Sequence, residues 1–374
     1  MIYLDYHSTS PLDPRVLKVM MPYLRGRFGN PASGHALGRE AAAAVEKARV
    51  EVARLIGAEA REIVFTSGAT ESNNLAIKGV AQASASLRSH IITVVTEHKS
   101  VLDPMKRLSI GVGAPRRVAP TYLGVGRDGL IDLDELERAI TPRTALITIM
   151  AAHNEIGVIQ PLAEIGRIVA RKGVLFHTDA VQAAGRIPLD VKAMGIHLLS
   201  LSAHKFCGPK GVGALYVRKK NPRVNLLPLA EGGGQEAGLR SGTLNVPGIV
   251  GMGEACRLAR IEGPRENRRL RVLRDRLLTS LSQGTRCVVN GSLTRRLSNN
   301  LNVSFERPVL PVKGVVVSAG SACLSTSPEP SYVLKALGVP ENLRKNAVRF
   351  GLGRFTTKRD IDRAARAIIK KLCR

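Results

Sequence analysis

A lysine and an aspartate each end a short apolar segment of the kind that forms a buried β-strand. Lys205 follows the apolar run of HLLSLSAHKF, and Asp179 ends the run of GVLFHTDAVQ. A lysine in a partly desolvated pocket has a lowered pKa and can form a Schiff base with a carbonyl group. Lys205 is therefore a candidate for covalent chemistry. The alternative interpretation is that Lys205 is an ordinary surface charge.

Two further segments supply what a carbonyl cofactor with a phosphate group requires. The segment FTSGATESNN predicts a strand, a turn of small residues at 67–70 and the start of a helix. Backbone N–H groups at a helix N-terminus bind phosphate. His98, which ends VVTEH, could lie over a ring and act as an acid or base. With Asp179 beside a pyridine nitrogen, this set predicts a site for pyridoxal 5'-phosphate.

One cysteine lies in a segment with neither strand nor helix pattern. Cys323 stands between small residues in SAGSACLSTSPEPSY, and Ser, Thr and Pro follow it. A small residue at a turn is one interpretation, and a thiol that has to travel between two places is the other. At an ordinary pKa near 8.5, only a few per cent of a thiol is ionised at pH 7, so a nearby cation such as protonated His98 would raise its reactivity.

Short apolar runs alternate with helical patterns over most of the chain, as in EIVFTSG, ESNNLAIKGVAQA and HIITVVTEH. This alternation predicts an α/β fold whose mostly parallel central sheet is covered by helices on both faces. Ligands bind at the carboxyl edge of such sheets. From about residue 257 the pattern changes to a smaller α+β domain. We predict a large domain over residues 16–256 and a small domain of residues 1–15 and 257–374, which carries the Cys323 loop at about 318–331.

The composition indicates a globular protein with an unusual charge. The 374 residues include 56 Lys and Arg against 30 Asp and Glu, a net charge of +26, which attracts phosphates, nucleic acids or acidic proteins. The densest basic segment, residues 264–278, predicts an amphipathic helix with Leu270, Leu273 and Leu277 on its apolar side. A solvated face is one interpretation of it. Aromatic residues make up only 3%, which argues against stacking on nucleic-acid bases.

The cysteines and the chain start bear on the cellular compartment. Five scattered cysteines, at 207, 256, 287, 323 and 373, have neither disulfide-framework nor metal-binding spacing, so free thiols and no metal site are expected. The first residues resemble no signal peptide, and no run reaches the roughly 18 apolar residues of a membrane span. These features favour a cytoplasmic protein.

The chain closely resembles the pyridoxal-phosphate-dependent cysteine desulfurases, in the branch with the long catalytic loop within the class-V aminotransferase family. The likeness extends over nearly the whole chain, and its longest strings are YLDYHSTSPLDPRV, FGNPAS, EIVFTSGATESNNLAIKG, SAHKFCGPKGVGALYV, RSGTLNVPGIVGMGEA and SAGSACLSTSPEPSYVLKALG. The resemblance implies the PLP-dependent transferase fold of type I, as in aspartate aminotransferase.

The resemblance also implies roles for particular residues. Lys205 would hold the cofactor and later take the substrate α-proton, Asp179 would pair with the pyridine nitrogen, and Cys323 would be the nucleophile that takes sulfur. His98 would be catalytic and stack on the ring. The remaining implied contacts are Gln182 to the phenolic oxygen, Ala69, Thr70, Ser202, His204 and the partner subunit's Thr243 to the phosphate, and Asn154, Arg349 and Asn30 to the substrate.

The implied reaction converts L-cysteine to L-alanine and leaves a persulfide on Cys323. A homodimer is implied, with a sulfur acceptor that is an iron–sulfur scaffold, a tRNA-thiolating enzyme or a DNA-phosphorothioating enzyme. The chain ends at Arg374, where relatives that serve scaffolds often carry a further tail, so the resemblance does not select among them. An aminotransferase or another lyase of the same fold, and a basic protein that binds nucleic acid, are the alternatives.

Two segments depart from the pattern of the relatives. Pro308 and Pro311 lie where relatives usually carry a helix before the catalytic loop, and proline makes a helix unfavourable here. His153 replaces the first Asn of an Asn-Asn-Glu sequence, while Asn154 is kept, so little effect is expected.

Overall fold

The computed structural model describes residues 1–84, 88–112, 117–319 and 331–373. Cys323 and most of the predicted loop at 318–331 therefore lie outside the described residues. The strands are β1 (Ile2–Tyr3), β2 (Ile63–Thr66), β3 (His90–Val94), β4 (Ala119–Leu123), β5 (Thr144–Thr148), β6 (Leu175–Asp179), β7 (Leu198–Ser202), β8 (Gly213–Val217), β9 (Cys287–Val289), β10 (Asn300–Phe305), β11 (Val315–Val316) and β12 (Ala347–Gly351).

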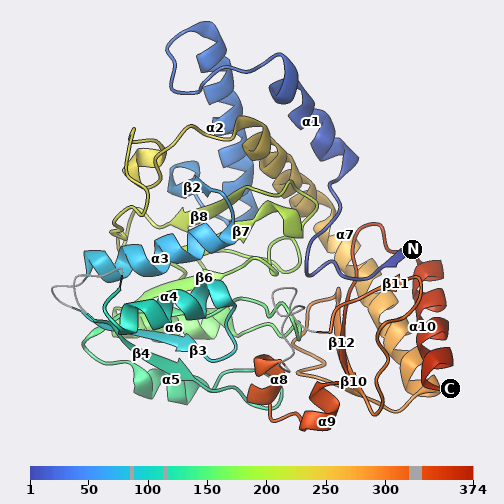
Figure 1. Ribbon diagram of the computed structural model, residues 1–374. Helices are drawn as coiled ribbons and strands as arrows, with labels where there is room; N and C mark the ends of the chain where they lie inside the picture. Colours follow the sequence, from blue (N-terminus) through green and yellow to red (C-terminus); the bar gives the residue numbers. More distant parts are fainter. Residues whose placement is uncertain (85–87, 113–116, 320–330, 374) are drawn as a thin grey trace.

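The helices alternate with the strands of the first half of the chain, and the long helix α7 follows the last strand of the central sheet (Figure 1). The α-helices are α1 (Pro14–Arg25), α2 (Ala36–Ile56), α3 (Ala69–Ala83), α4 (Lys99–Ser109), α5 (Leu133–Ala139), α6 (Leu162–Lys172), α7 (Val246–Gly284), α8 (Tyr332–Ala336), α9 (Glu341–Arg344) and α10 (Lys358–Leu372). Single-turn 3-10 helices are η1 (Ala60–Glu62), η2 (Ala203–Lys205) and η3 (Glu236–Gly238).

The central sheet has the strand order β2-β8-β7-β6-β5-β3-β4. Its strands are parallel except β8, which is antiparallel to both of its neighbours. This confirms the predicted α/β fold with a mostly parallel sheet. Parallel strands all present their carboxyl ends at one edge, which is why Asp179 at the end of β6 and Lys205 just after β7 lie at the same edge.

Both faces of this sheet are buried, because successive side chains of a strand point to opposite faces. Ile91 and Leu198 pack with residues of α3 and α4 in one apolar cluster. Their neighbours Ile92 and Leu199 pack in a second cluster with residues of α2, α6 and α7. The sheet therefore forms the middle of three layers, as its continuous apolar strands predict.

The helix α7 joins two separate cores. We expected the small domain to begin near residue 257, but the helix that leads into it, α7, begins at Val246, inside the large predicted domain. Its first half packs with α1 and α2, and its second half packs with α10 (Figure 1). Leu270, Leu273 and Leu277 are buried in the second core, as predicted, together with residues of β10, β12 and α10. We propose that the two domains divide within α7.

The segment before the Cys323 loop forms no helix, as the two prolines predict. Residues 306–314 have neither helix nor strand structure, and they lead into β11. This strand pairs in parallel with β1, so that Ile2 lies opposite Val315. The N-terminus thereby joins the small domain and supports the strand that precedes residue 320.

After β1 the chain crosses to the large domain along the residues that surround Lys205. The Ser10 N–H donates to the His204 carbonyl oxygen at 2.9 Å, and the Asp13 N–H donates to the Cys207 carbonyl oxygen at 3.0 Å. Asp13 then caps α1, its side chain accepting from the Arg15 N–H as its sequence position predicts. These bonds hold residues 5–13 against the predicted catalytic lysine.

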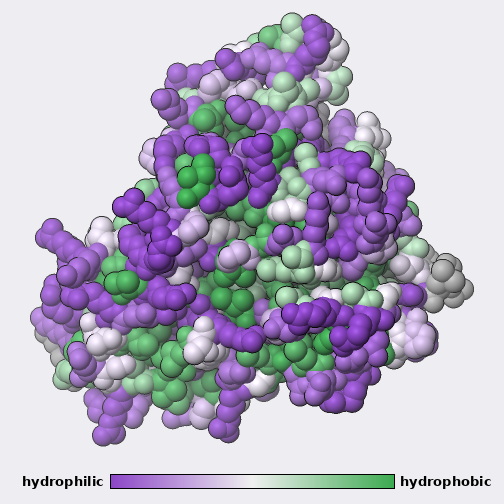
Figure 2. All heavy atoms as spheres, turned by 180° about the vertical axis from the view of Figure 1, so that it is seen from behind, coloured by the Kyte–Doolittle hydropathy of each residue, from purple (hydrophilic) through white to green (hydrophobic). Residues whose placement is uncertain are grey.

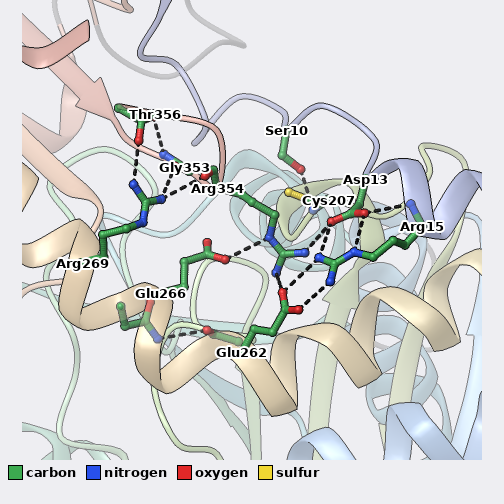
Figure 3. A network of polar contacts seen from close by, with 12 residues as sticks. Ser10, Asp13, Arg15, Cys207, Glu262, Glu266, Arg269, Gly353, Arg354 and Thr356 are labelled. Atoms are coloured by element: carbon green, nitrogen blue, oxygen red, sulfur yellow. Dashed lines mark hydrogen bonds and ion pairs between the residues drawn. The ribbon is translucent and has the colours of Figure 1, made fainter. Parts of the chain in front are cut away.

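A network of ion pairs joins the N-terminal crossing, residues 5–13, to both domains (Figure 3). Arg354, from the segment between β12 and α10, contacts Asp13 at 2.6 Å, Glu262 at 3.3 Å and Glu266 at 3.0 Å. Arg15 donates to Asp13 and Glu262 from the other side. The pKa of Asp13 lies well below its usual range. The hydrogen bonds from Arg15 and Arg354 lower this pKa by more than burial raises it.

Replacement of Arg354 by methionine should lower the free energy of unfolding by about 3 kcal/mol, because removal of one partner leaves buried carboxylates uncompensated. The loss should be visible in urea unfolding of the cofactor-loaded protein. The matched control is Arg276→Met, since Arg276 pairs with Asp362 at a more exposed site, where loss of an ion pair changes stability little. Equal losses in the two variants would contradict the proposed strength of the network.

The effect of Arg354→Met should also depend on pH. The folded-state pKa values of Asp13 and Glu266 are both lowered, for Glu266 because its ion pairs with Arg186 and Arg354 outweigh burial. A lowered carboxyl pKa stabilises the fold above the unfolded pKa of about 4, and this contribution is lost as pH falls through the folded pKa. The stability difference between wild type and variant should therefore shrink in acid.

Candidate active site

A cavity of about 510 Å³ lies at the carboxyl edge of the central sheet, and residues from both predicted domains line it. It brings together ten of the residues that the resemblance assigned to the site. These are Ala69, Thr70, His98, Asn154, Asp179, Gln182, Ser202, His204, Lys205 and Arg349.

Lys205 enters this cavity from η2, the single turn that follows β7. Its Nζ donates to the carbonyl oxygens of His7 at 2.6 Å and Ser8 at 2.8 Å. Both acceptors belong to the N-terminal crossing. The crossing thus holds the amine at the end of the strand, in the partly buried setting that the sequence pattern predicts for a reactive lysine.

Asp179 and His98 are joined through two side chains that the sequence analysis did not single out. One amide group, Nδ2 of Asn73, donates to Asp179 Oδ2 at 2.7 Å and to Ser100 Oγ at 2.9 Å. The Ser100 Oγ lies 2.8 Å from His98 Nδ1, which also accepts from the Ser100 N–H at 3.1 Å. His98 Nδ1 is therefore an acceptor, and Ser100 donates its hydroxyl hydrogen to it.

The electrostatic setting of His98 differs from our expectation. Burial lowers the pKa of His98, and although Asp179 raises it, Lys205 lowers it further, so the net direction is downward. A neutral imidazole is also consistent with the two hydrogen bonds donated to Nδ1. The structure thus disfavours the protonated His98 that we expected to help ionise Cys323.

The turn between β2 and α3 has the geometry expected of a phosphate-binding turn. Gly68 has φ 154°, a conformation that other residues rarely adopt, and it precedes the N-terminus of the 15-residue helix α3. A Cβ on Gly213 would lie 2.6 Å from Gly68 Cα, so β8 and this turn meet through two glycines. The first N–H groups of α3 have no intrahelical acceptors and lie beside the cavity at Ala69 and Thr70.

Ser202 and His204 reach the same end of the cavity from the end of β7 and from η2. His204 Nδ1 lies 3.1 Å from Thr9 Oγ1. Burial, and then the charges of Lys205 and Lys210, lower the pKa of His204 to about 4. His204 is therefore neutral at pH 7, and Lys210 is the additional cation that lines this part of the cavity.

Arg349 reaches the cavity from β12 of the small domain. Its guanidinium donates to Asp5 Oδ1 and Ser8 Oγ, both at 2.8 Å, and to the Asn154 carbonyl oxygen at 3.1 Å. Its Nε is buried and has no hydrogen-bond partner among the described residues. The guanidinium of Arg349 lines the cavity, and a guanidinium is suited to binding a ligand carboxylate.

Asn30 and Thr243 do not reach this cavity. They line a separate one of about 400 Å³, together with Arg49 and Glu236, whose side chains form an ion pair at 2.8 Å. Thr243 was expected to reach the phosphate in the cofactor site of the other subunit, and its position in its own chain does not test that prediction.

Sequence reasoning missed His7, Asn73 and Ser100. His7 and Asn73 lie inside strings that carry the resemblance, and Ser100 lies two residues after His98, but polar residue types alone carry no sign of which partner they meet. Asn73 and Ser100 are buried on α3 and α4, and His7 is 2% exposed beneath the cavity. Their burial was the missing signal, since a buried polar side chain must find hydrogen-bond partners.

The cavity suits pyridoxal phosphate by the chemistry of its donor set. It combines a lysine amine, the buried carboxylate of Asp179, an aromatic imidazole and a helix N-terminus, which are what an aldehyde, a pyridine nitrogen, a ring face and a phosphate require. Within the described part of the chain, no group of His, Cys, Asp and Glu side chains is arranged to hold a metal ion. No described helix has the length and apolarity needed to span a membrane.

Comparisons with known proteins agree with this site. The family model described as aminotransferase class-V matches residues 2–364. The chain is 53% identical to a cysteine desulfurase IscS of Anaeromyxobacter sp. (strain Fw109-5), over 99% of this chain and 92% of the relative. It is 52% identical to the IscS of Rickettsia bellii, over 99% and 91%.

Solved structures agree as well. A NifS-like protein superposes with a TM-score of 0.91 at 39% identity, covering 100% of this chain and 99% of the other. A structure described as SspA in complex with cysteine has a TM-score of 0.84 at 38% identity, covering 96% and 100%.

The chain therefore belongs to the class-V aminotransferase family, whose fold the sheet and its helices reproduce. Within that family it belongs to the pyridoxal-phosphate-dependent cysteine desulfurases of the IscS and NifS type.

Proposed function

We propose that this chain removes sulfur from L-cysteine at the cavity around Lys205, releases L-alanine and carries the sulfur as a persulfide on Cys323. The observation that carries the proposal is the convergence of Lys205, Asp179 and Arg349 on one cavity, from β7, β6 and the small domain. Lys205→Ala and Cys323→Ser, described in the Discussion, test the two halves of this reaction.

The large-domain residues would hold the cofactor. Lys205 would bind its aldehyde carbon, Asp179 its pyridine nitrogen and Gln182 its phenolic oxygen, while His98 covers the ring. The N-terminus of α3 with Ala69 and Thr70, together with Ser202 and His204, would hold the phosphate. When bound, pyridoxal phosphate supplies an electron sink that weakens the bond between Cβ and sulfur of the substrate.

Arg349 and Asn154 would hold the substrate carboxylate. The three hydrogen bonds that the Arg349 guanidinium donates fix its plane, and its place in the cavity lining supports a role in binding an anion. Lys205 would then take the α-proton, because its amine enters the same cavity.

The Cys323 thiolate would attack the substrate sulfur and form a new S–S bond while the Cβ–S bond breaks. The persulfide then passes to an acceptor protein. We propose an iron–sulfur scaffold as the acceptor, because the curated relatives at 50–53% identity carry the name IscS. Trapping of mixed disulfides on Cys323 in the native host tests this, and capture of a tRNA-thiolating or DNA-phosphorothioating enzyme instead would contradict it.

We further propose a homodimer in the cytoplasm. Thr243 lines a cavity outside the Lys205 site of its own chain, which supports the role proposed for it at a second subunit. The described cysteines, Cys207, Cys256, Cys287 and Cys373, are all free thiols, as a reducing compartment favours.

The positive charge gathers on the outside of the small domain. We define the basic face as the exposed cations Arg265, Arg268 and Arg271 of α7 and Arg359, Arg363, Arg366 and Lys370 of α10. The α10 members recur at intervals of three and four residues and so share one side of that helix. No carboxylate of the described chain forms an ion pair with them. Figure 2 shows hydrophilic side chains over most of the small domain, at the left.

Arg274 does not belong to the basic face, although its sequence position suggested it. It is 9% exposed, and it donates to the Leu297 carbonyl oxygen and to Asp275. We propose that the basic face docks an acidic sulfur acceptor, because unpaired cations on one surface attract a complementary anionic one.

Sulfur transfer to this acceptor should slow steeply as salt rises, because attraction between exposed charges is screened over about 8 Å at physiological salt. Alanine formation with a small thiol reductant should respond little. The variant Arg268→Gln/Arg271→Gln/Arg363→Gln should slow transfer at low salt by about tenfold. The control is Arg127→Gln/Arg138→Gln/Arg167→Gln, which removes the same charge from the large domain. Equal effects of the two triple variants would contradict docking at the basic face.

A further inference from the structure

His7 contacts both the predicted cofactor site and the small domain. It lies between β1 and α1, it lines the 510 Å³ cavity, and its side chain is buried. Its ring Nδ1 lies 2.8 Å from Gln182 Oε1, and its carbonyl oxygen accepts from Gln182 Nε2 at 3.0 Å. Its other ring nitrogen, Nε2, lies 3.1 Å from Asn300 Nδ2 on β10. No other described imidazole joins the two domains in this way.

The direction of each hydrogen bond in this series follows from its last member, Arg296. Arg296, which can only donate, contacts Asn300 Oδ1 at 3.0 Å, so the other side of that amide is its Nδ2. Nδ2 can only donate, which makes His7 Nε2 an acceptor. In a neutral ring the hydrogen is then on Nδ1, and Nδ1 donates to Gln182 Oε1.

The surroundings keep this ring neutral and in place. Burial, and then the charge of Arg349, lower the pKa of His7 to about 3, although the bond to Gln182 opposes them. A second ring hydrogen on Nε2 would also point at the donor Nδ2 of Asn300. The Asn300 amide itself is held by Arg296 and by close packing, because a Cβ on Gly157 would lie 2.3 Å from Asn300 Cγ.

The contacts of His7 fix the orientation of the Gln182 side-chain amide. A glutamine amide can turn either its oxygen or its nitrogen toward a ligand. Here Oε1 is engaged by His7 Nδ1, and one hydrogen of Nε2 is engaged by the His7 carbonyl oxygen. The second hydrogen of Nε2 has no acceptor among the described residues, and Gln182 lines the cavity. Gln182 is therefore oriented to offer a donor to a ligand.

We propose that His7 is a positioning residue that, held by Arg296 through Asn300, fixes the Gln182 amide so that its N–H meets the phenolic oxygen of pyridoxal phosphate. This inference rests on the proposed role of Gln182. A hydrogen bond donated to an oxyanion favours its ionised form and lowers its pKa. Through the proton that this oxygen shares with the Lys205 nitrogen, the bond should also lower the pH midpoint of the visible absorbance of the bound cofactor.

The test measures that midpoint by titrating the absorbance of the cofactor-loaded protein. His7→Leu fills the space but leaves Gln182 Oε1 without a donor, so the amide can turn, and the midpoint should rise by about one pH unit. His7→Asn carries a donor at the δ position, as imidazole Nδ1 does, and should keep the midpoint near wild type. His177→Leu is the matched control, because His177 is equally buried on β6 and bonded to Thr148 and Ser200, and it should leave the midpoint unchanged.

Gln182→Ala separates this inference from the role on which it rests. If Gln182→Ala leaves the midpoint unchanged, the proposed role of Gln182 is wrong and the inference falls with it. If Gln182→Ala raises the midpoint and His7→Leu does not, only the positioning role is wrong. In the double variant, His7→Leu should add nothing to Gln182→Ala, and an additive shift would mean that His7 acts by another route.

A measurement on the wild-type protein covers the case in which His7→Leu does not fold. With ¹⁵N-labelled histidine, the His7 ring should remain neutral with its hydrogen on Nδ1 across neutral pH. The His7→Asn spectrum identifies its signals by their loss. A ring that carries its hydrogen on Nε2, or that titrates near the ordinary histidine pKa of about 6.5, would overturn the proposal.

Discussion

Replacement of Lys205 by alanine should lower the rate of alanine formation from L-cysteine by at least about a thousandfold, because the variant lacks both the covalent anchor and the base. The cavity should still bind the cofactor without a covalent bond, since Asp179 and the N-terminus of α3 are untouched. Alanine formation measures the first effect. Borohydride treatment followed by mass spectrometry measures the second, because reduction should attach the cofactor permanently to the wild-type chain only.

The control for this variant is Lys192→Ala, which removes an exposed lysine from the connection between β6 and β7. It should keep both the turnover and the borohydride product. Turnover near the wild-type rate in Lys205→Ala would remove the basis for the proposed role of this lysine.

Replacement of Cys323 by serine should reduce sulfur transfer to an acceptor to the background level, while binding of L-cysteine and of the cofactor is retained. A serine oxygen cannot form a persulfide, and the described residues around the cofactor are unchanged by the substitution. Mass spectrometry after incubation with L-cysteine should find added sulfur on Cys323 in the wild type and none in the variant.

Two other thiols serve as controls for this experiment. Cys207 lies two residues after Lys205, but it is buried, and burial raises the pKa of its thiol, so it should stay unreactive. Cys373 is exposed but lies at the far end of α10. Cys207→Ser and Cys373→Ser should both retain the persulfide, and sulfur on Cys207 in the wild-type protein would refute the assignment of Cys323.

The sequence by itself was sufficient for the elements whose cause is local. Asp13 and Pro14 are residue types that favour a helix start, as at α1, and Gly57 is a type that favours a helix end, as at α2. Alternating strands and helices predicted the parallel sheet. The sheet then placed Asp179 and Lys205 at one edge, because all parallel strands end there. These predictions succeed because caps, turns and strand direction depend on residues that are neighbours in sequence.

Only the tertiary structure decided which side chains meet across long distances in the chain. The contacts of His7 with Gln182 and Asn300 span 175 and 293 positions, and no residue type announces such partners. The same holds for Arg274, which is buried against Leu297 although its neighbours Arg268 and Arg271 face solvent.

The physical reason is that hydrogen-bond direction and burial are properties of a completed environment. An imidazole can donate or accept at either nitrogen, and the folded chain chooses by what it places beside each of them. The sequence determined that this protein has a lysine, a carboxylate and a helix N-terminus at one sheet edge. The packing of β10 and the N-terminal crossing against that edge determined how Gln182 is turned toward the cavity.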